Sequence, residues 1–151
     1  MENYNAIYER WLKATEENAE LHEELLSVRD DPKAIEDRFY RELEFGTAGL
    51  RGVLGAGTNR MNIFVVAKAT QGYSNYLLRH FENPSVAIGY DSRIHSQDFA
   101  EAAAAVFAAN GIRVYLYPKL MPVPACSFAV RDLGCSGGVM ITASHNPAKY
   151  N

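Results

Sequence analysis

The residues best suited to chemistry form one short polar run, Thr142-Ala143-Ser144-His145-Asn146-Pro147, directly after an apolar segment. Ser144 would supply a hydroxyl nucleophile, which needs a neighbouring acid or base, and His145 would supply an imidazole. In a continuing strand these two side chains would point to opposite faces, but Asn146-Pro147 indicates a stiff turn that lets both reach one substrate. The alternative interpretation is a polar turn with a capping serine and a surface histidine.

A second candidate is the glycine-rich stretch 45–60 (FGTAGLRGVLGAGTNR), which holds five of the chain's 11 glycines. Arg51 lies between Gly49 and Gly52, so a tightly folded backbone could offer both N–H groups and a guanidinium to an anion. The other interpretation is a series of turns with a solvated arginine. The stretch matches a dinucleotide fingerprint poorly, because Arg60 stands where the third glycine belongs.

A third cluster, Gly89-Tyr90-Asp91-Ser92-Arg93, follows an apolar segment. Asp91 and Arg93 could form an ion pair that supports a loop, or Arg93 could bind an anion. Polar groups at the ends of strands often satisfy the backbone of neighbouring loops, so the sequence leaves both interpretations open.

The first 44 residues contain no glycine and predict two helices. Apolar residues spaced by three and four from Tyr4 to Val28 line one helical face, and Pro32 begins a second helix that ends at about Leu43. The apolar face could pack on its own domain, or it could be the seam of a dimeric coiled coil with Asn18 as the polar register position.

From residue 45 onward, helical and strand patterns alternate, which predicts an α/β fold. Helix caps are expected at Asn62 and at Ser96, the second helix ending at Asn110-Gly111, and Pro122 with Pro124 opens a third helix to about Leu133. The buried face of the first of these helices is expected to hold Ile63, Val66, Thr70, Tyr73, Leu77 and Phe81. Strands are expected at 85–90, 112–117 and 137–141. We expect a mainly parallel or mixed sheet with helices on both faces, preceded by an N-terminal helical extension, and ligands at the carboxyl ends of the strands.

Composition restricts the classes of partner. The chain has 151 residues, 48% of them apolar, and a formal net charge of −3, so nothing favours nucleic acid or an anionic membrane. No apolar run approaches the ~20 residues that span a bilayer, and the N-terminus lacks the features of a signal peptide. The chain has only two cysteines and no C-x-x-C spacing, which is consistent with reduced thiols in the cytosol. We expect a cytoplasmic protein with no nucleic-acid or membrane partner.

The three polar clusters together resemble the motifs of one family. Residues 142–147 are similar to the phosphoserine loop of the α-D-phosphohexomutases, which include phosphoglucomutase and phosphomannomutase. Residues 45–52 resemble that family's FGT-x-G-x-RG segment, and residues 89–93 resemble its G-x-D-x-R strand end. The leading helices and residues 43–62 look most like the phosphoglucomutase branch with phosphopentomutase-like members. The resemblance implies a helical extension at 1–44 and the family's domain I at 45–151, ending inside the active-site loop.

The resemblance also implies an isomerase that converts glucose 1-phosphate reversibly into glucose 6-phosphate through a phosphoserine and a bisphosphate intermediate. Mannose phosphate and pentose phosphates are alternative substrates. The implied catalytic residues are Ser144, His145 and Arg51: Ser144 carries the phosphate, Arg51 offsets its charge, and His145 supports proton transfer or contacts phosphate. Mg²⁺ is implied as the cofactor, bound to this chain only through the phosphate on Ser144.

The remaining site residues implied by the resemblance are positioning residues: Thr142, Asn146 and Pro147 in the serine loop, Thr47 in the glycine-rich stretch, and Arg93, which would brace the loop or contact phosphate. In the family, the other Mg²⁺ ligands, a catalytic lysine and the sugar-recognition loop follow later in the chain. We therefore expect the 151-residue chain alone to be inactive. A different class of function, a non-catalytic module that binds phosphate or a partner through its helical seam, is the competing hypothesis.

Overall fold

The computed structural model describes residues 3–47 and 49–151, so the motif residue Ala48, and Met1 and Glu2 of the expected helical extension, lie outside the described residues. The chain divides into two compact units. The first runs to Val65 and includes Tyr150, and the second comprises Val66–Lys149 and Asn151. Each unit is described by itself below, and the domain boundary at residue 44 stays a prediction.

The first unit begins with three helices rather than the two expected: α1 (Tyr4–Ala14), α2 (Ala19–Ser27) and α3 (Pro32–Phe39). The prediction of one continuous helix over 4–28 is wrong, because the chain turns between α1 and α2. The Asn18 side chain accepts a hydrogen bond from the N–H of Leu21 at 3.0 Å and so begins a new helix. Asn18 is therefore an N-cap and not a polar position in a seam. The last helix of the three ends at Phe39, four residues before the predicted Leu43.

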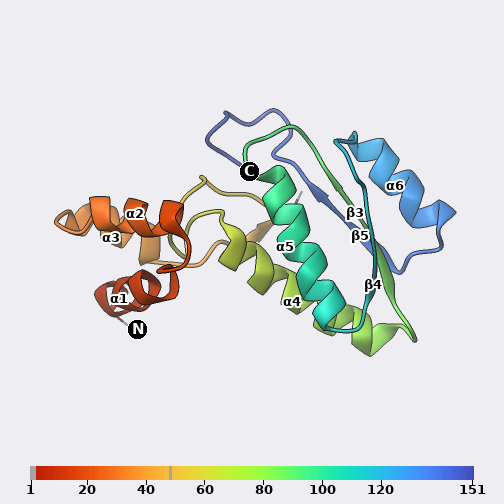
Figure 1. Cartoon of the computed structure of the whole chain (residues 1–151), viewed down its shortest axis with the longest axis horizontal. Coiled ribbons are helices and arrows are strands. Elements are labelled where there is room, and N and C mark those ends of the chain that lie inside the picture. The colour runs from red at the N-terminus through yellow and green to blue at the C-terminus, as the bar shows by residue number, and fades with distance from the viewer. Residues whose placement is uncertain (1–2, 48) are drawn as a thin grey trace. The chain divides into compact units, whose positions relative to one another are not determined.

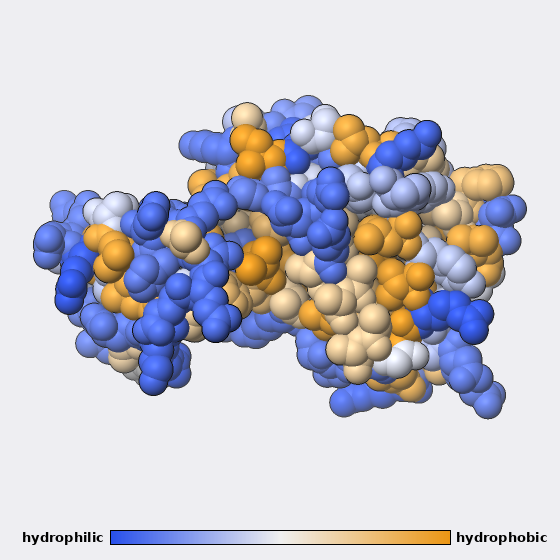
Figure 2. All heavy atoms as spheres, in the orientation of Figure 1, coloured by the Kyte–Doolittle hydropathy of each residue, from blue (hydrophilic) through white to orange (hydrophobic). Residues whose placement is uncertain are grey.

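The apolar face of these helices packs inside the first unit. Its buried cluster consists of Tyr8, Leu21, Leu25, Ile35, Phe39 and Ala56. The Tyr8 hydroxyl donates to the carbonyl of Leu25 at 3.0 Å, which joins α1 to α2. The visible surface of these helices is mostly hydrophilic (Figure 2). Burial within the unit favours the interpretation that the apolar face predicted between Tyr4 and Val28 packs in the chain's own core.

The second unit is built on a three-stranded parallel sheet in the order β4-β3-β5. The central strand is β3 (Ser85–Tyr90), and β4 (Arg113–Leu116) and β5 (Gly137–Ile141) flank it. Residues 86–90 are all buried, which requires cover on both faces of β3 because successive side chains point to opposite faces. Figure 1 shows α5 (Ser96–Ala109) and α6 (Val123–Asp132) on the two sides of the sheet. The α/β fold expected from the sequence is confirmed.

Helix α4 (Ile63–His80) has the predicted cap, since Asn62 accepts a hydrogen bond from the N–H of Val65 at 3.0 Å. Val66, Thr70 and Leu77 are buried as expected. Phe81, by contrast, follows the helix and is 43% exposed, so its predicted place on the buried face is wrong.

The predicted Ser96 cap of α5 is also wrong. The helix begins at Ser96, after His95 in the left-handed region with φ 62°, and the cap position makes no side-chain hydrogen bond. The Ser96 hydroxyl instead donates to Asp91 at 2.8 Å, a contact that belongs to the site described next. Within the described ranges, no helix has both the length and the apolar character that crossing a bilayer requires.

Candidate active site

The serine loop leaves the sheet at the carboxyl end of β5. Ala143 is fully buried, whereas Ser144 beside it is exposed. The N–H of Asn146 donates to the Ala143 carbonyl at 3.0 Å and closes a tight turn, and the N–H of Ser144 donates to Thr142 Oγ1 at 3.0 Å. A buried alanine and two turn hydrogen bonds therefore project one serine hydroxyl out of the domain.

Ser144 has a φ of 54°, in the left-handed region that few non-glycine residues adopt. This backbone conformation breaks the alternation of a strand, so Ser144 and His145 need not point apart. Ser144 Oγ lies 3.3 Å from Nδ1 of His145, within hydrogen-bond reach. The structure thus brings together the hydroxyl and the imidazole that the sequence singled out, with a backbone strain of the kind that clusters at functional sites.

Arg93 holds this loop from the neighbouring strand end. Its Nη2 donates to the carbonyls of Ser144 at 2.6 Å and Asn146 at 2.7 Å, and its Nη1 donates to the Pro147 carbonyl at 3.3 Å. Hydrogen bonds from a guanidinium are charge-assisted and stronger than neutral ones. The arginine side chain is 16% exposed, so water competes little for these contacts. Three carbonyls of the loop are therefore fixed by one side chain.

Asp91 orients Arg93. Its Oδ1 accepts from the backbone N–H of Arg93 at 3.0 Å and from the Ser96 hydroxyl at 2.8 Å, and its Oδ2 lies 3.7 Å from Arg93 Nε. Burial acts to raise the pKa of Asp91, but hydrogen bonds from Thr142, the Arg93 N–H and Ser96, together with the Arg93 charge, outweigh it. The net result is a pKa below the ordinary value of 3.8, so the carboxylate is firmly ionised at neutral pH.

Sequence reasoning missed two residues of this network, Ser96 and Asn151. The Asn151 side chain is 3% exposed and donates to the Ser96 hydroxyl at 2.8 Å and to the Ile94 carbonyl at 3.0 Å. Ser96 thus accepts from Asn151 and donates to Asp91. Spacing along the chain gave no signal for these contacts, because residue 151 reaches residue 96 only in the folded chain.

Arg51 and Thr47 belong to the first unit. There, β1 (Phe45–Gly46) and β2 (Gly49–Leu50) pair as a short antiparallel hairpin, with Thr47 exposed in its turn. Arg51 follows the hairpin and is half-buried. Among the described residues of this unit, the Arg51 guanidinium makes no hydrogen bond or ion pair. Ser144 lies in the second unit, and the joint pocket of Arg51 and Ser144 stays a prediction.

The described residues do not form a metal site of their own. In the ranges 3–47 and 49–151, no three side chains of histidine, cysteine, aspartate or glutamate gather in a group that could hold an ion. Carboxylate oxygens are the protein ligands that Mg²⁺ prefers. The Mg²⁺ expectation therefore depends on the resemblance and on a phosphate at Ser144.

Comparisons with known proteins bear on the family of this chain. The family model for "Phosphoglucomutase/phosphomannomutase, alpha/beta/alpha domain I" matches residues 42–151. A phosphoribomutase from Saccharomyces cerevisiae is 42% identical over 147 residues, covering 93% of this chain and 24% of the relative. A phosphoglucomutase from Staphylococcus haemolyticus is 46% identical over 116 residues, covering 77% and 21%. A solved structure from Thermus thermophilus, assigned to the phosphomannomutases, gives a TM-score of 0.67 at 35% identity and covers 73% of this chain and 24% of that one.

The sheet, its flanking helices and the braced serine turn define an α/β domain with an exposed hydroxyl at a strand end. The chain belongs to the phosphoglucomutase/phosphomannomutase family and matches that family's domain I. It spans about a quarter of the length of the curated relatives it matches.

Proposed function

We propose that the protein carrying this chain is a phosphosugar mutase and that Ser144 carries the phosphate that it transfers. The observation that supports this most directly is the serine hydroxyl exposed on a left-handed turn, with three loop carbonyls held by Arg93. Phosphoryl transfer depends mainly on positioning and charge neutralisation, which is what a rigid loop beside cationic groups supplies.

In the proposed reaction, the bond between Ser144 Oγ and phosphorus breaks as a free hydroxyl oxygen of the sugar phosphate bonds to that phosphorus. The sugar hydroxyl gives up its proton, and Ser144 Oγ takes up a proton as it leaves the phosphorus. His145, whose Nδ1 lies 3.3 Å from Ser144 Oγ, is our candidate for this proton transfer. The resulting bisphosphate returns its other phosphate to Ser144 Oγ. Arg51 would offset part of the roughly −1.5 to −2 charge of the phosphoserine.

Glucose phosphate is the first substrate to test, with transfer between the C1 and C6 hydroxyls. Since relatives of this chain include phosphoribomutases, ribose phosphate is the second. Mg²⁺ is proposed as the cofactor, and the phosphate on Ser144 would be the ligand that this chain supplies to it.

The test is to incubate the intact protein with glucose 1,6-bisphosphate labelled in its phosphates and to locate the label by peptide mapping. We expect the label on the peptide that contains Ser144, and none in the Ser144→Ala variant. Ser127→Ala, which removes an exposed hydroxyl on α6, is the matched control and should be labelled like the unmodified protein. Label at another residue, or full transfer by Ser144→Ala, would show that the proposed carrier is wrong.

A further inference from the structure

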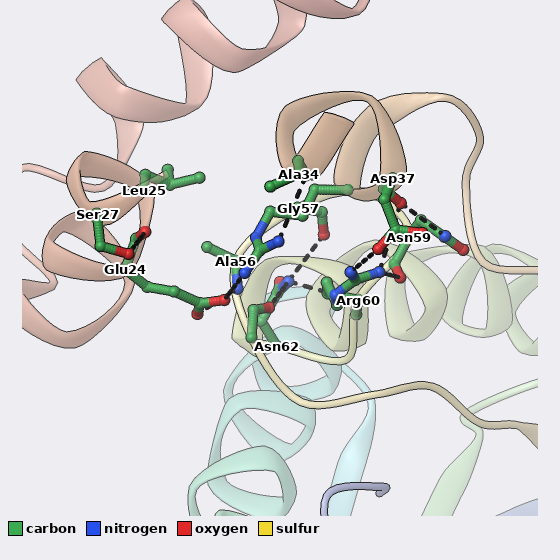
Figure 3. A network of polar contacts seen from close by, with 12 residues as sticks. Glu24, Leu25, Ser27, Ala34, Asp37, Ala56, Gly57, Asn59, Arg60 and Asn62 are labelled. Atoms are coloured by element: carbon green, nitrogen blue, oxygen red, sulfur yellow. Dashed lines mark hydrogen bonds and ion pairs between the residues drawn. The ribbon is translucent and has the colours of Figure 1, made fainter. Parts of the chain in front are cut away.

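A carboxylate on α2 supports the glycine-rich turn that follows Arg51. Glu24 Oε2 accepts a hydrogen bond from the backbone N–H of Ala56 at 2.8 Å, and Glu24 Oε1 accepts one from Arg38 Nη2 at 2.9 Å. Figure 3 shows the Glu24 carboxylate pointing toward the Ala56 backbone. Both charged side chains are shielded, with Glu24 29% and Arg38 17% exposed, so the contacts meet limited competition from water.

The turn is shaped to fit this carboxylate. Gly55 has a φ of 138°, and a Cβ there would lie 2.6 Å from Glu24 Oε1. Gly57 has a φ of 134°, and a Cβ there would lie 2.7 Å from the Arg38 carbonyl. Only glycine allows this backbone to wrap so closely around Glu24 and Arg38. The turn and the helices are therefore fitted to each other.

Asn62 holds the same turn from within the loop. Its Nδ2 donates to the carbonyls of Gly55 at 2.8 Å and Gly57 at 2.9 Å, and the side chain is 2% exposed. Figure 3 shows the Asn62 side chain directed at Gly57. The peptide units around Ala56 are thus held by Glu24 through an N–H group and by Asn62 through two carbonyls.

The fixed turn is connected directly to the segment that carries Arg51. The N–H of Met61 donates to the Val53 carbonyl at 2.8 Å, and the N–H of Gly55 donates to the Met61 carbonyl at 3.1 Å. Gly52, next to Arg51, is packed so closely that a Cβ there would lie 2.6 Å from Leu43 Cδ1 and 3.3 Å from the Met61 nitrogen. Displacement of the turn at residues 55–57 would therefore shift the backbone around Arg51.

We propose that Glu24 is a positioning residue for the phosphate-binding function of Arg51, and that α2 and α3 take part in the site through this carboxylate. The proposal depends on the proposed function and extends the role of Arg51 in it: besides offsetting the charge of the phosphoserine, Arg51 is required to contact a phosphate of the bound substrate. It gives the N-terminal helices a catalytic purpose beyond the stability of their own core.

The test measures steady-state kinetics of the intact protein with glucose 1-phosphate. Glu24→Ala is expected to raise KM about tenfold with a smaller change in kcat, since hydrogen bonds to charged groups hold the turn and Arg51 binds ground-state phosphate. Glu24→Gln keeps an acceptor for the Ala56 N–H and should raise KM only about threefold. The Gln variant also preserves volume, so it decides the question if the Ala variant does not fold. Glu23→Gln, an exposed neighbour on the same helix, is the control and should leave KM unchanged.

A double-mutant cycle with Arg51→Lys separates positioning from general stability. If Glu24 acts through Arg51, the double variant loses less than the product of the two single effects. Independent, multiplying effects, or an unchanged KM in both Glu24 variants, would overturn the inference. Failure of the proposed function is a different result: Arg51→Lys and Ser144→Ala would both behave like the unmodified protein.

Discussion

At the level of single residues, the serine loop depends on a relay of charge-assisted contacts from Asp91 through Arg93 to three carbonyls. The guanidinium is planar and offers several donors in fixed directions, so it can satisfy three acceptors at once, whereas a lysine ammonium cannot match that geometry. The sequence suggested an ion pair between the two residues or an anion contact by Arg93. It could not show the carbonyl contacts, because they join residues about fifty positions apart.

Replacing Arg93 should loosen the loop selectively. We expect Arg93→Lys to speed hydrogen exchange of the amides at 144–147 and to slow phosphoryl transfer about tenfold, since a small misplacement of a reacting group is costly. Exchange measured by NMR or mass spectrometry, together with a mutase assay, checks both effects. Arg113→Lys, an exposed arginine on β4, is the control and should change neither. Unchanged exchange at the loop would contradict the bracing role.

The Asp91 carboxylate should make the domain sensitive to acid. Its folded pKa lies below 3.8, whereas the pKa of an unfolded aspartate is about 3.9. The contribution of Asp91 to stability is therefore fully present above about pH 4 and is lost as the pH falls through the folded pKa. Asp91→Asn is expected to lower the free energy of unfolding by about 2 kcal/mol at pH 7. The variant should also lose less stability than the unmodified protein as the pH falls below about 4. Urea unfolding between pH 3 and pH 7 measures this, with exposed Asp132→Asn as the control. An equally steep acid limb in Asp91→Asn would refute the assignment.

At the level of elements, the spacing of apolar residues predicted the strands of the sheet more accurately than it predicted the N-terminal helices. The predicted strands at 85–90 and 137–141 agree with β3 and β5 because both are short apolar segments bounded by turn residues. The break between α1 and α2 escaped detection because the apolar spacing of three and four continues through it, so Asn18 resembled a seam position while acting as a cap. The three-and-four spacing of apolar residues alone cannot distinguish one long helix from two shorter helices that share a buried face.

Two glycines that look alike in the sequence should respond in opposite ways to alanine. Gly57→Ala would force a residue with a Cβ to φ 134° and against the Arg38 carbonyl, so we expect a loss of about 2 kcal/mol or more. Gly72→Ala, in the middle of α4 with open space around its Cβ position, should gain about 0.5–1 kcal/mol from helix propensity. Chemical denaturation of both variants measures the difference. Equal effects would mean that the turn at 55–57 is less constrained than its geometry indicates.

At the level of the whole molecule, the state of association depends on where the apolar side chains of α1 and α2 are buried. The sequence allowed a dimeric seam or a self-contained core, and the burial of Leu25 favours the core: it is fully buried in the first unit, where its carbonyl also accepts the Tyr8 hydroxyl. Because the apolar face of α1 and α2 is already covered within its own unit, it leaves little apolar surface for a second copy of the chain to bind.

We therefore expect the 151-residue chain to sediment as a monomer at high concentration, and Leu25→Ala to act on stability alone. Truncating this side chain should cost about 2–5 kcal/mol through lost burial and a residual cavity, with no change in sedimentation coefficient. Leu26→Ala, the next residue along the helix and 44% exposed, is the matched control and should cost well under about 1 kcal/mol. Analytical ultracentrifugation and urea unfolding of the three proteins measure both properties. A dimer that dissociates in Leu25→Ala would restore the seam interpretation, because a core residue can abolish association only if the partner chain helps to cover it.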